Sequence, residues 1–219
     1  AVSVKGMVGS DGYVSGSVEM SDTVDEKSSY RASVGYMHSD GWRENTDTDR
    51  FEANIRYDHI LDDNNDLKIM FNTSVTDAQQ AGSFSDYANI ENGSTDASDS
   101  SRYDTALTKT DIKRQFDYAR LSVEWNNYSY DGLEISLTPY VRYNRNRYVQ
   151  TWYPYHYPLN DNELKTVGLL EKNIYETSWG KVITGFDAEY TESSLKYTQL
   201  YDTSVFGKNY VAGPIFDYD

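Results

Sequence analysis

The sequence predicts an all-β chain that forms a segment of an antiparallel up-and-down transmembrane β-barrel. The first observation behind this prediction is a strict alternation of residue character: in residues 50–59, Phe51, Ala53, Ile55 and Tyr57 are separated by four polar residues, three of them charged. A strand with this pattern has one apolar face and one charged face. In a membrane barrel the apolar face meets lipid and the charged face lines a wet lumen, whereas in a soluble sandwich the apolar face would be a core.

The same alternation recurs along the chain and defines the expected strands in order. Together with the turn residues it predicts about nine strands, near residues 1–8, 12–20, 29–38, 50–59, 67–76, 115–126, 133–146, 164–175 and 181–192. The face assignment is ambiguous only for 164–175. Pro139 lies inside a predicted strand and lacks a ladder donor, so we expect a bulge or a local irregularity there.

The second observation is the rhythm of the connections. After the opening pair of strands, short connections (21–28, 60–66, 127–132 and 177–180) alternate with long ones (39–49, 77–114, 147–163 and everything after 192). In an up-and-down meander every second connection lies at the same end, so one end has tight turns and the other has large loops. The loop 77–114 is polar and of low complexity, and we expect it to be mobile or folded onto a ligand.

Composition agrees with an ordered chain and excludes several classes of protein. Aromatic residues make up 15% of the 219 residues although the mean hydropathy is -0.75, and disordered chains are poor in aromatics. No apolar stretch approaches the length of a transmembrane helix, but a membrane-spanning strand needs only about 9–11 residues. The net charge of -15 argues against a nucleic-acid partner. The absence of Cys fits an oxidising compartment.

Several segments resemble the barrel of a TonB-dependent outer-membrane receptor. They are Gly9-Ser10-Asp11-Gly12-Tyr13, Asp40-Gly41-Trp42-Arg43-Glu44-Asn45-Thr46 with Asp49-Arg50-Phe51, Thr138-Pro139-Tyr140-Val141-Arg142-Tyr143-Asn144, Thr166-Val167-Gly168-Leu169, Gly185-Phe186-Asp187-Ala188-Glu189 and the terminal Gly213-Pro214-Ile215-Phe216-Asp217-Tyr218-Asp219. The last of these looks like a loop that leads into further strands. The order of the motifs carries the resemblance, which covers most of the chain.

This resemblance implies that residues 1–219 are the first part of a barrel of roughly 22 strands. The plug domain with its TonB-coupling segment would precede Ala1, and nothing here matches it or a closing strand with a terminal aromatic. Nine strands is also an odd count for a bacterial single-chain barrel, whose strands are even in number. We therefore expect the plug domain and the later strands to be absent from this chain.

The resemblance further implies a function: energised uptake of a ferric siderophore or a similar bulky nutrient across the bacterial outer membrane, with outer-membrane lipid and the TonB complex as partners. Two alternatives stay open. One is a small passive outer-membrane porin for acidic oligosaccharides, and the other is a soluble β-sandwich binding module. An enzyme is not expected, because the sequence has no Gly-x-Ser-x-Gly elbow, no phosphate-binding glycine loop and no Cys nucleophile.

Candidate ligand-binding residues gather in the long connections. The densest aromatic cluster is the run 148–158, in which rigid rings with polar tips suit recognition of an aromatic or sugar-like ligand and Arg147 suits an anion. The predicted set is Trp42, Arg43, Arg147, Trp152, Tyr153, Tyr155, His156 and Tyr157. The alternative interpretation is that these rings pack the loop or extend an interfacial girdle.

The polar face of the predicted strands carries ten charges: Arg31, Glu52, Arg56, Asp58, Lys68, Arg120, Glu124, Arg142, Asp187 and Glu189. They could contact a plug or line a path, but ordinary cross-strand ion pairs in a wet lumen are the favoured interpretation, and none of the ten is singled out as functional. The three His are scattered, so no transition-metal site and no cofactor is predicted. Calcium at Asp47 and Asp49, or at Asp96, Asp99 and Asp104, is weighed against simple solvation.

Overall fold

The computed structural model describes residues 1–42, 46–79, 113–149, 158–200, 202–205 and 208–218. Every regular element in these ranges is a β-strand: β1 (Val2–Val8), β2 (Val14–Asp25), β3 (Ser28–Ser39), β4 (Thr48–Asp62), β5 (Asn65–Gln79), β6 (Lys113–Tyr130), β7 (Leu133–Val149), β8 (Pro158–Thr177), β9 (Gly180–Gln199), β10 (Thr203–Val205), β11 (Lys208–Tyr210) and β12 (Gly213–Tyr218). The predicted all-β class is confirmed.

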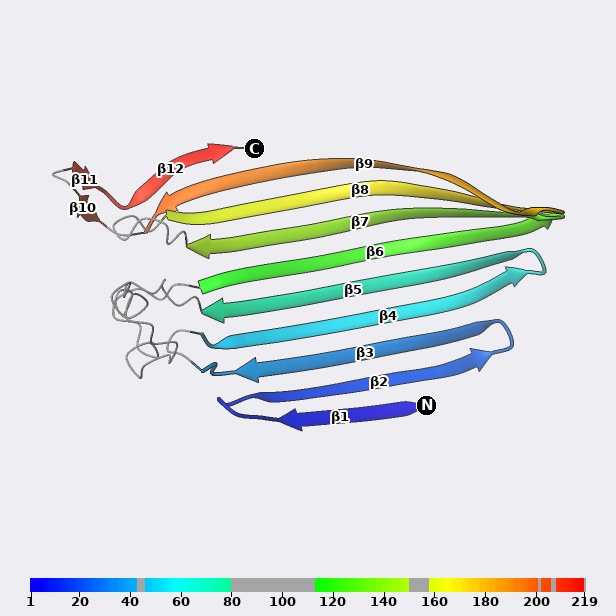
Figure 1. The fold of residues 1–219 in the computed structure, drawn as a ribbon, viewed down its shortest axis with the longest axis horizontal. Coiled ribbons are helices and arrows are strands. Elements are labelled where there is room, and N and C mark those ends of the chain that lie inside the picture. The colour runs from blue at the N-terminus through cyan, green and yellow to red at the C-terminus, as the bar shows by residue number, and fades with distance from the viewer. Residues whose placement is uncertain (43–45, 80–112, 150–157, 201, 206–207, 219) are drawn as a thin grey trace.

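Ten of the strands form one sheet in the order β1-β2-β3-β4-β5-β6-β7-β8-β9-β12, with antiparallel pairing throughout (Figure 1). Each strand from β1 to β9 therefore pairs with its neighbours in the chain, as an up-and-down meander requires. The other sheet in the described residues is the short hairpin β10–β11. No second layer packs on the ten-stranded sheet in the described part of the chain, so this is not the two-sheet architecture of a sandwich.

One prediction about the strands was wrong. The terminal segment Gly213–Tyr218, expected to be a loop, is β12, and it pairs with β9 through partners such as Gly213 with Gln199. Gly213 and Pro214 are typical of a turn, and this short strand has a register shift between Pro214 and Phe216, so its period-2 signal is broken.

The strands are also longer than predicted, and the connections at one end are correspondingly tighter. β8 and β9 have 20 residues each, against the expected 164–175 and 181–192. Their added ends are mostly polar, and apolar alternation therefore does not reveal them. Two-residue turns at 26–27, 63–64, 131–132 and 178–179 leave the loops and longer connections at the opposite end (Figure 1). The predicted rhythm of connections is confirmed.

Successive hairpins are tied together at the end with the tight turns, which we call the turn end. In three places the backbone carbonyl of the second turn residue accepts a hydrogen bond from a backbone N–H of the next hairpin. The Ile60 N–H donates to the Lys27 carbonyl (2.8 Å), the Tyr128 N–H to the Asn64 carbonyl (2.8 Å) and the Glu176 N–H to the Gly132 carbonyl (2.7 Å). Each turn is thereby included in the ladder. The opposite end, which carries the long connections, is called the loop end.

The register places nine apolar residues directly beside one another on nine strands. This apolar row follows the paired residues Val2, Met20, Ala32, Ile55, Phe71, Leu121, Val141, Val167 and Tyr190. Most of its side chains are exposed, among them Val141 at 50% and Tyr190 at 71%. The row also resolves the ambiguous strand, because Val167 in β8 shares the apolar face with Val141.

One residue along, the same nine strands present a polar row on the other face: Ser3, Glu19, Ser33, Asn54, Asn72, Arg120, Arg142, Thr166 and Thr191. On this polar face side chains cover one another: Tyr140 is 6% exposed and Asn126 only 1%. Side chains converge on the concave side of a curved sheet and diverge on the convex side. We therefore assign the polar face to the concave, lumenal side.

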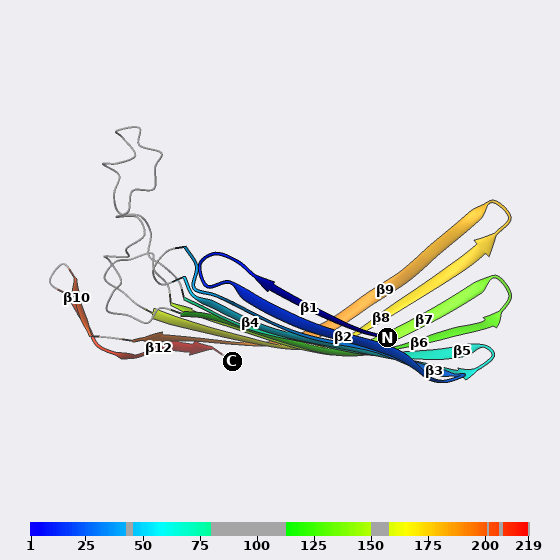
Figure 2. The same cartoon turned by 90° about the horizontal axis from the view of Figure 1, so that it is seen from below.

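The sheet is strongly twisted, and in the edge-on view the β8–β9 hairpin diverges from β3 and β5 at the turn end (Figure 2). Gly185 permits a close approach of the two strands of this hairpin. A Cβ at Gly185 would lie 2.3 Å from the carbonyl oxygen of Glu171. A side chain there would force the backbones apart.

Pro139 causes a local irregularity but no bulge. The ladder between β6 and β7 runs to the pair Ser122–Tyr140 and resumes at Trp125–Leu137 in the same register. The two intervening positions lose their pairing because proline has no N–H to donate. The register shift in this pair of strands lies instead between Asn127 and Tyr130, next to the turn.

Candidate functional site

The concave face carries two hydrogen-bonded stretches along the polar row. In β3 to β5, Asn72 Nδ2 donates to Asn54 Oδ1 (2.7 Å) and Asn54 Nδ2 to the Ser33 hydroxyl (3.4 Å). In β8 and β9, the hydroxyls of Thr166 and Thr191 lie 2.9 Å apart. Amide and hydroxyl groups thus bond to one another across strands, as expected for a polar lumen wall.

Towards the turn end, a buried network centres on Asn126. Lys68 Nζ lies 2.7 Å from Glu124 Oε1. Asn126 Nδ2 donates to Glu124 (3.0 Å) and to Asp66 (2.8 Å), and Asn126 Oδ1 accepts from the Ser136 hydroxyl (2.6 Å). Both the Nδ2 and the Oδ1 atom of this buried amide group therefore have hydrogen-bond partners. A satisfied buried network of this kind makes this part of the wall rigid.

A second cluster surrounds Tyr140. Its ring lies over Gly168, and its hydroxyl donates to Glu189 Oε2 (2.8 Å). The Arg120 guanidinium lies 4.5 Å from the ring centroid, within range of a cation–π contact. Arg142 Nη2 lies 3.4 Å from Glu189 Oε2. Four strands, β6 to β9, are joined by these contacts.

The ten charges predicted for the polar face all lie on the concave face by register. Several form ordinary ion pairs with neighbours: Arg31 with Glu19, Arg56 with Asp58 (2.8 Å), Lys68 with Glu124 and Arg142 with Glu189. These contacts support the interpretation as a solvated lumen wall with local charge pairing, and none of the pairs is singled out as a ligand site.

Of the eight predicted ligand-binding residues, two lie in the described part of the chain. Trp42 follows the loop end of β3 and is 49% exposed. Arg147 lies near the loop end of β7. The other six, Arg43, Trp152, Tyr153, Tyr155, His156 and Tyr157, lie outside the described residues, so their role stays a prediction.

Arg147 occupies the same face of β7 as Val141, the convex face. Its Nε lies 3.6 Å from Asp161 Oδ2, and its Nη1 donates to Gln115 (3.4 Å). The Asp161 carboxylate also accepts two hydrogen bonds from the Arg145 guanidinium, from Nε to Oδ1 (2.8 Å) and from Nη2 to Oδ2 (2.7 Å). These polar groups lie beyond the apolar row on the loop side, a position that suits the lipid headgroup level.

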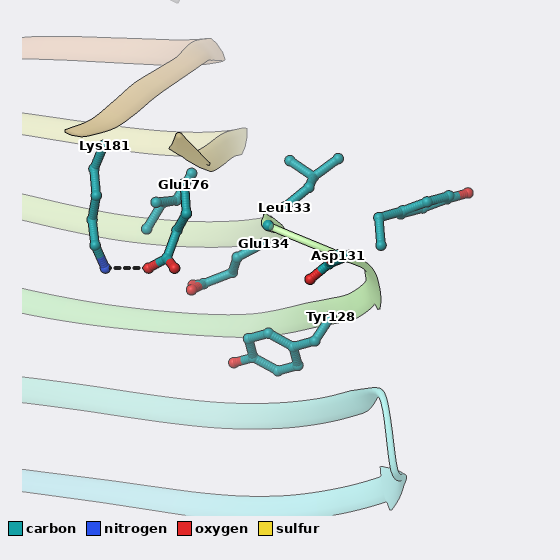
Figure 3. A pocket seen from close by; sticks show the side chains of 9 residues that line it. Tyr128, Asp131, Leu133, Glu134, Glu176 and Lys181 are labelled. Atoms are coloured by element: carbon teal, nitrogen blue, oxygen red, sulfur yellow. Dashed lines mark ion pairs between the residues drawn. The ribbon is translucent and has the colours of Figure 1, made fainter. Parts of the chain in front are cut away.

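A shallow recess of about 290 Å³ lies at the turn end, where β6, β7, β8 and β9 meet (Figure 3). Lys181 Nζ forms an ion pair with Glu176 (2.6 Å) across it. Tyr128 donates a hydrogen bond to Asp66 (3.1 Å), and its partial burial together with this bond raises the pKa of Tyr128 to about 12. The phenol therefore stays a donor at neutral pH. We regard the recess as the hydrated rim of the concave face.

At the loop end of β3, His38 lies between two carboxylates. Its Nδ1 is 2.9 Å from Asp49 and its Nε2 is 3.0 Å from Asp40, and the Tyr36 hydroxyl also donates to Asp49. Hydrogen bonds to Asp49 and then Asp40 raise the pKa of His38, while those from Tyr36 and then His38 lower the pKa of Asp49. Asp49 thus accepts hydrogen bonds from the Tyr36 phenol and the His38 imidazole, and within the described residues Asp47 and Asp49 belong to no group of three His, Cys, Asp or Glu side chains that could hold a metal ion.

This arrangement predicts a pH-dependent stability. A raised His38 pKa in the folded protein stabilises it below the unfolded pKa of about 6.5, and this contribution is lost as the pH rises through the folded value. Melting temperatures of wild type and His38→Gln in detergent should therefore differ most near pH 5 and converge at higher pH. A difference that stays constant from pH 5 to 9 would contradict the assignment.

Within the described residues, no group of three His, Asp or Glu side chains is arranged to hold a metal ion. In the same ranges there is no helix long and apolar enough to cross a membrane. The calcium candidates Asp96, Asp99 and Asp104 lie outside these ranges.

No protein-family model and no curated protein matches this sequence. The fold, by contrast, is similar to that of three solved structures over nearly the whole chain. The ferric citrate transporter FecA in its unliganded form matches with a TM-score of 0.68 and 10% identity, over 100% of this chain and 32% of FecA. FpvAI, from its complex with pyocin S2, matches with a TM-score of 0.70 and 12% identity, over 99% and 32%.

The siderophore receptor PiuA from Acinetobacter baumannii matches with a TM-score of 0.63 and 13% identity, over 97% of this chain and 32% of PiuA. This chain thus spans about a third of the length of each of these three proteins. The predicted fold, an antiparallel up-and-down transmembrane β-barrel segment, is confirmed. The resemblance to TonB-dependent receptors is likewise confirmed at the level of the fold.

Proposed function

We propose that this chain forms part of the wall of an outer-membrane receptor that takes up a ferric siderophore or a similar bulky nutrient, energised through TonB. The apolar row carries the proposal. It runs over nine strands with exposed side chains, and the polar row beside it lines the opposite face. A soluble protein would have to cover such a surface, whereas lipid requires it.

The chain on this account is one part of a longer protein. The plug domain and the segment that engages the TonB complex would lie in the rest of that protein. The remaining strands would lie there too, and they would pair with the free edges of β1 and β12 and close the barrel. Unpaired strand edges are unfavourable in lipid, so closure is a physical requirement for any barrel in the membrane. The protein would reside in the outer membrane of a Gram-negative bacterium.

Growth on a ferric chelate tests the proposal. A strain that lacks the intact gene should lose growth under iron restriction on at least one of a panel of ferric siderophores, and deletion of tonB should cause the same loss. Uptake that survives tonB deletion would contradict the energised mechanism and favour the passive porin.

The aromatic run 148–158, here called the aromatic loop, is predicted to contribute to ligand capture. In the intact receptor, Trp152→Ala combined with Tyr155→Ala should weaken binding of the chelate that supports growth by roughly tenfold or more, since each aromatic contact is worth on the order of 1 kcal/mol. Trp179→Ala, at the opposite end of the sheet and 77% exposed, is the control and should leave the affinity unchanged. A correctly assembled double variant with wild-type affinity would show that the loop is structural.

A further inference from the structure

Two polar side chains, Glu171 and Asn173, interrupt the apolar surface on the convex face of β8. Glu171 lies four residues from Val167 of the apolar row and therefore on the same face of the strand. Its cross-strand partners on that face are Leu137 in β7 and Phe186 in β9, and Phe186 is 54% exposed. A carboxylate thus lies where the neighbouring strands present hydrocarbon to lipid.

Glu171 and Asn173 lie inside this apolar surface and not at its rim. On the same face of β8, Leu169 precedes Glu171 towards the loop end, and Tyr175 follows Asn173 towards the turn end. The paired positions on the convex face of β7 are all apolar: Leu133, Ile135, Leu137 and Pro139. A lipid headgroup at either membrane surface is therefore too distant to solvate Glu171, and a charged side chain at such a level is costly and marks a function.

The Glu171 carboxylate has little compensation within the described residues. It accepts one hydrogen bond, from Asn173 Nδ2 to Oε1, and it forms no ion pair there. In the ten-stranded sheet, the Lys and Arg residues of the convex face all lie on the loop side of the apolar row: Lys113, Arg145, Arg147, Lys165 and Lys196. No cation of this sheet is placed to neutralise Glu171.

Thr73 shows how a polar side chain is ordinarily accommodated on the same face. It lies between Phe71 and Val75 on β5, and its hydroxyl donates to the backbone carbonyl of Tyr118 (2.9 Å). A carboxylate cannot donate in this way, because it only accepts hydrogen bonds. The backbone N–H groups of β8 are engaged in the ladders with β7 and β9. Glu171 therefore needs a further donor from outside these three strands.

Only a molecule outside the barrel wall can supply that donor. Both strands that flank β8, β7 and β9, belong to the described sheet (Figure 1), so additional barrel strands pair elsewhere, at the sheet edges. A domain inside the lumen would meet the concave face. The convex side of Glu171 faces the membrane, where another protein at the same depth can reach it.

We propose that the convex face of β8 is the contact surface between two copies of this protein in the membrane, formed through Glu171 and Asn173. This pair is self-complementary, because the second Glu171 oxygen and the second N–H of the Asn173 amide have no partner among the described residues. Two copies inserted in the same orientation are related by a two-fold axis normal to the bilayer, so the same level of each copy meets.

In such a dimer, the free Asn173 N–H of each copy donates to Glu171 of the other. Interhelical side-chain hydrogen bonds of this kind hold membrane helices together, and the same chemistry applies between barrels. Leu137 and Phe186, which flank Glu171 on the two neighbouring strands, supply apolar contact around the polar pair. This inference rests on the placement of the apolar row in lipid and is independent of the transported solute.

The first test measures self-association of the intact protein in lipid vesicles, by energy transfer between copies labelled with donor and acceptor dyes. Wild type should associate, and Glu171→Leu combined with Asn173→Leu should weaken the association about tenfold, the loss expected for two membrane hydrogen bonds. The double variant should melt in detergent at the wild-type temperature or above, because leucine suits a lipid-facing position. Thr73→Leu, the matched control three strands away, should associate as wild type does.

The second test locates the contact. Thr184, the β9 partner of Asn173, is replaced by Cys in the intact protein, with any other Cys replaced, and a short bifunctional maleimide is added to the vesicles. The Thr184→Cys protein should form a crosslinked dimer, and Thr73→Cys should stay monomeric on a denaturing gel. Equal crosslinking at the two positions would overturn the proposed surface.

Two other results would overturn the proposal as well. One is a wild-type protein that is monomeric in vesicles, which is also the outcome if a different membrane protein covers this surface. The other is a double variant that associates as tightly as wild type. None of these results bears on the uptake of a chelate, which the growth experiment measures separately.

Discussion

Replacing Ile55 with Arg is expected to lower the free energy of unfolding of the intact barrel in a phospholipid bilayer by about 2–4 kcal/mol, the range for a cation at the midplane of the lipid face. Ile55 is 49% exposed and lies in the apolar row between Ala32 and Phe71. A guanidinium there must either leave its hydration shell or draw water and headgroups into the hydrocarbon. Equilibrium denaturation from lipid vesicles measures the change.

Asn54→Arg provides the matched control, because Asn54 is the adjacent residue on the concave face and is exposed to the lumen. Its substitution loses the hydrogen bonds to Ser33 and Asn72 and should cost only about 1 kcal/mol. Equal costs for the two substitutions would show that the two faces do not differ in their surroundings.

The substitution Gly168→Ala is expected to destabilise the barrel by about 2–3 kcal/mol, at the upper end of the cost of overpacking. A Cβ at Gly168 would lie 2.2 Å from Cζ of Tyr140. The ring would have to move, and with it the hydrogen bond to Glu189 and the contact with Arg120. Unfolding of the purified protein in detergent measures this cost.

Two further variants separate the clash from a general intolerance of alanine. In a Tyr140→Ala background, Gly168→Ala should cost less than about 1 kcal/mol, because the ring that it meets is gone. Gly16→Ala should be tolerated in the wild type, since the nearest atom to its added Cβ is the Lys5 carbonyl oxygen at 4.0 Å. An undiminished cost of Gly168→Ala without the ring would contradict the packing account.

Much of the fold could be predicted because alternation and turn spacing are local signals. The strand at residues 50–59 shows both faces in ten residues, and β4 extends from Thr48 to Asp62 around it. The polar ends of β2, β8 and β9 could not be predicted in the same way, because strands that continue past the lipid no longer need apolar residues. β12 was missed because its first residues, Gly213 and Pro214, favour turns.

The candidate site was less predictable, for two physical reasons. The polar Glu171 and Asn173 made the faces of the predicted strand 164–175 ambiguous, and only the register, which pairs Val167 with Val141, assigned them to the convex face. Whether an amide is satisfied also depends on partners distant in the sequence: Asn126 depends on Asp66, 60 residues away.

Site-directed spin labelling tests the central claim most directly, namely that the apolar row faces lipid and the polar row faces water. These 219 residues contain no Cys, so single cysteines are introduced along β4 and β7 of the intact protein in lipid bilayers, with any Cys outside these residues replaced. We predict that labels at Ala53, Ile55 and Val141 collide mainly with oxygen, which partitions into lipid, and that labels at Asn54 and Arg142 collide mainly with a water-soluble nickel chelate. Accessibility without this period of two, or nickel access at Ile55 and Val141, would contradict the account.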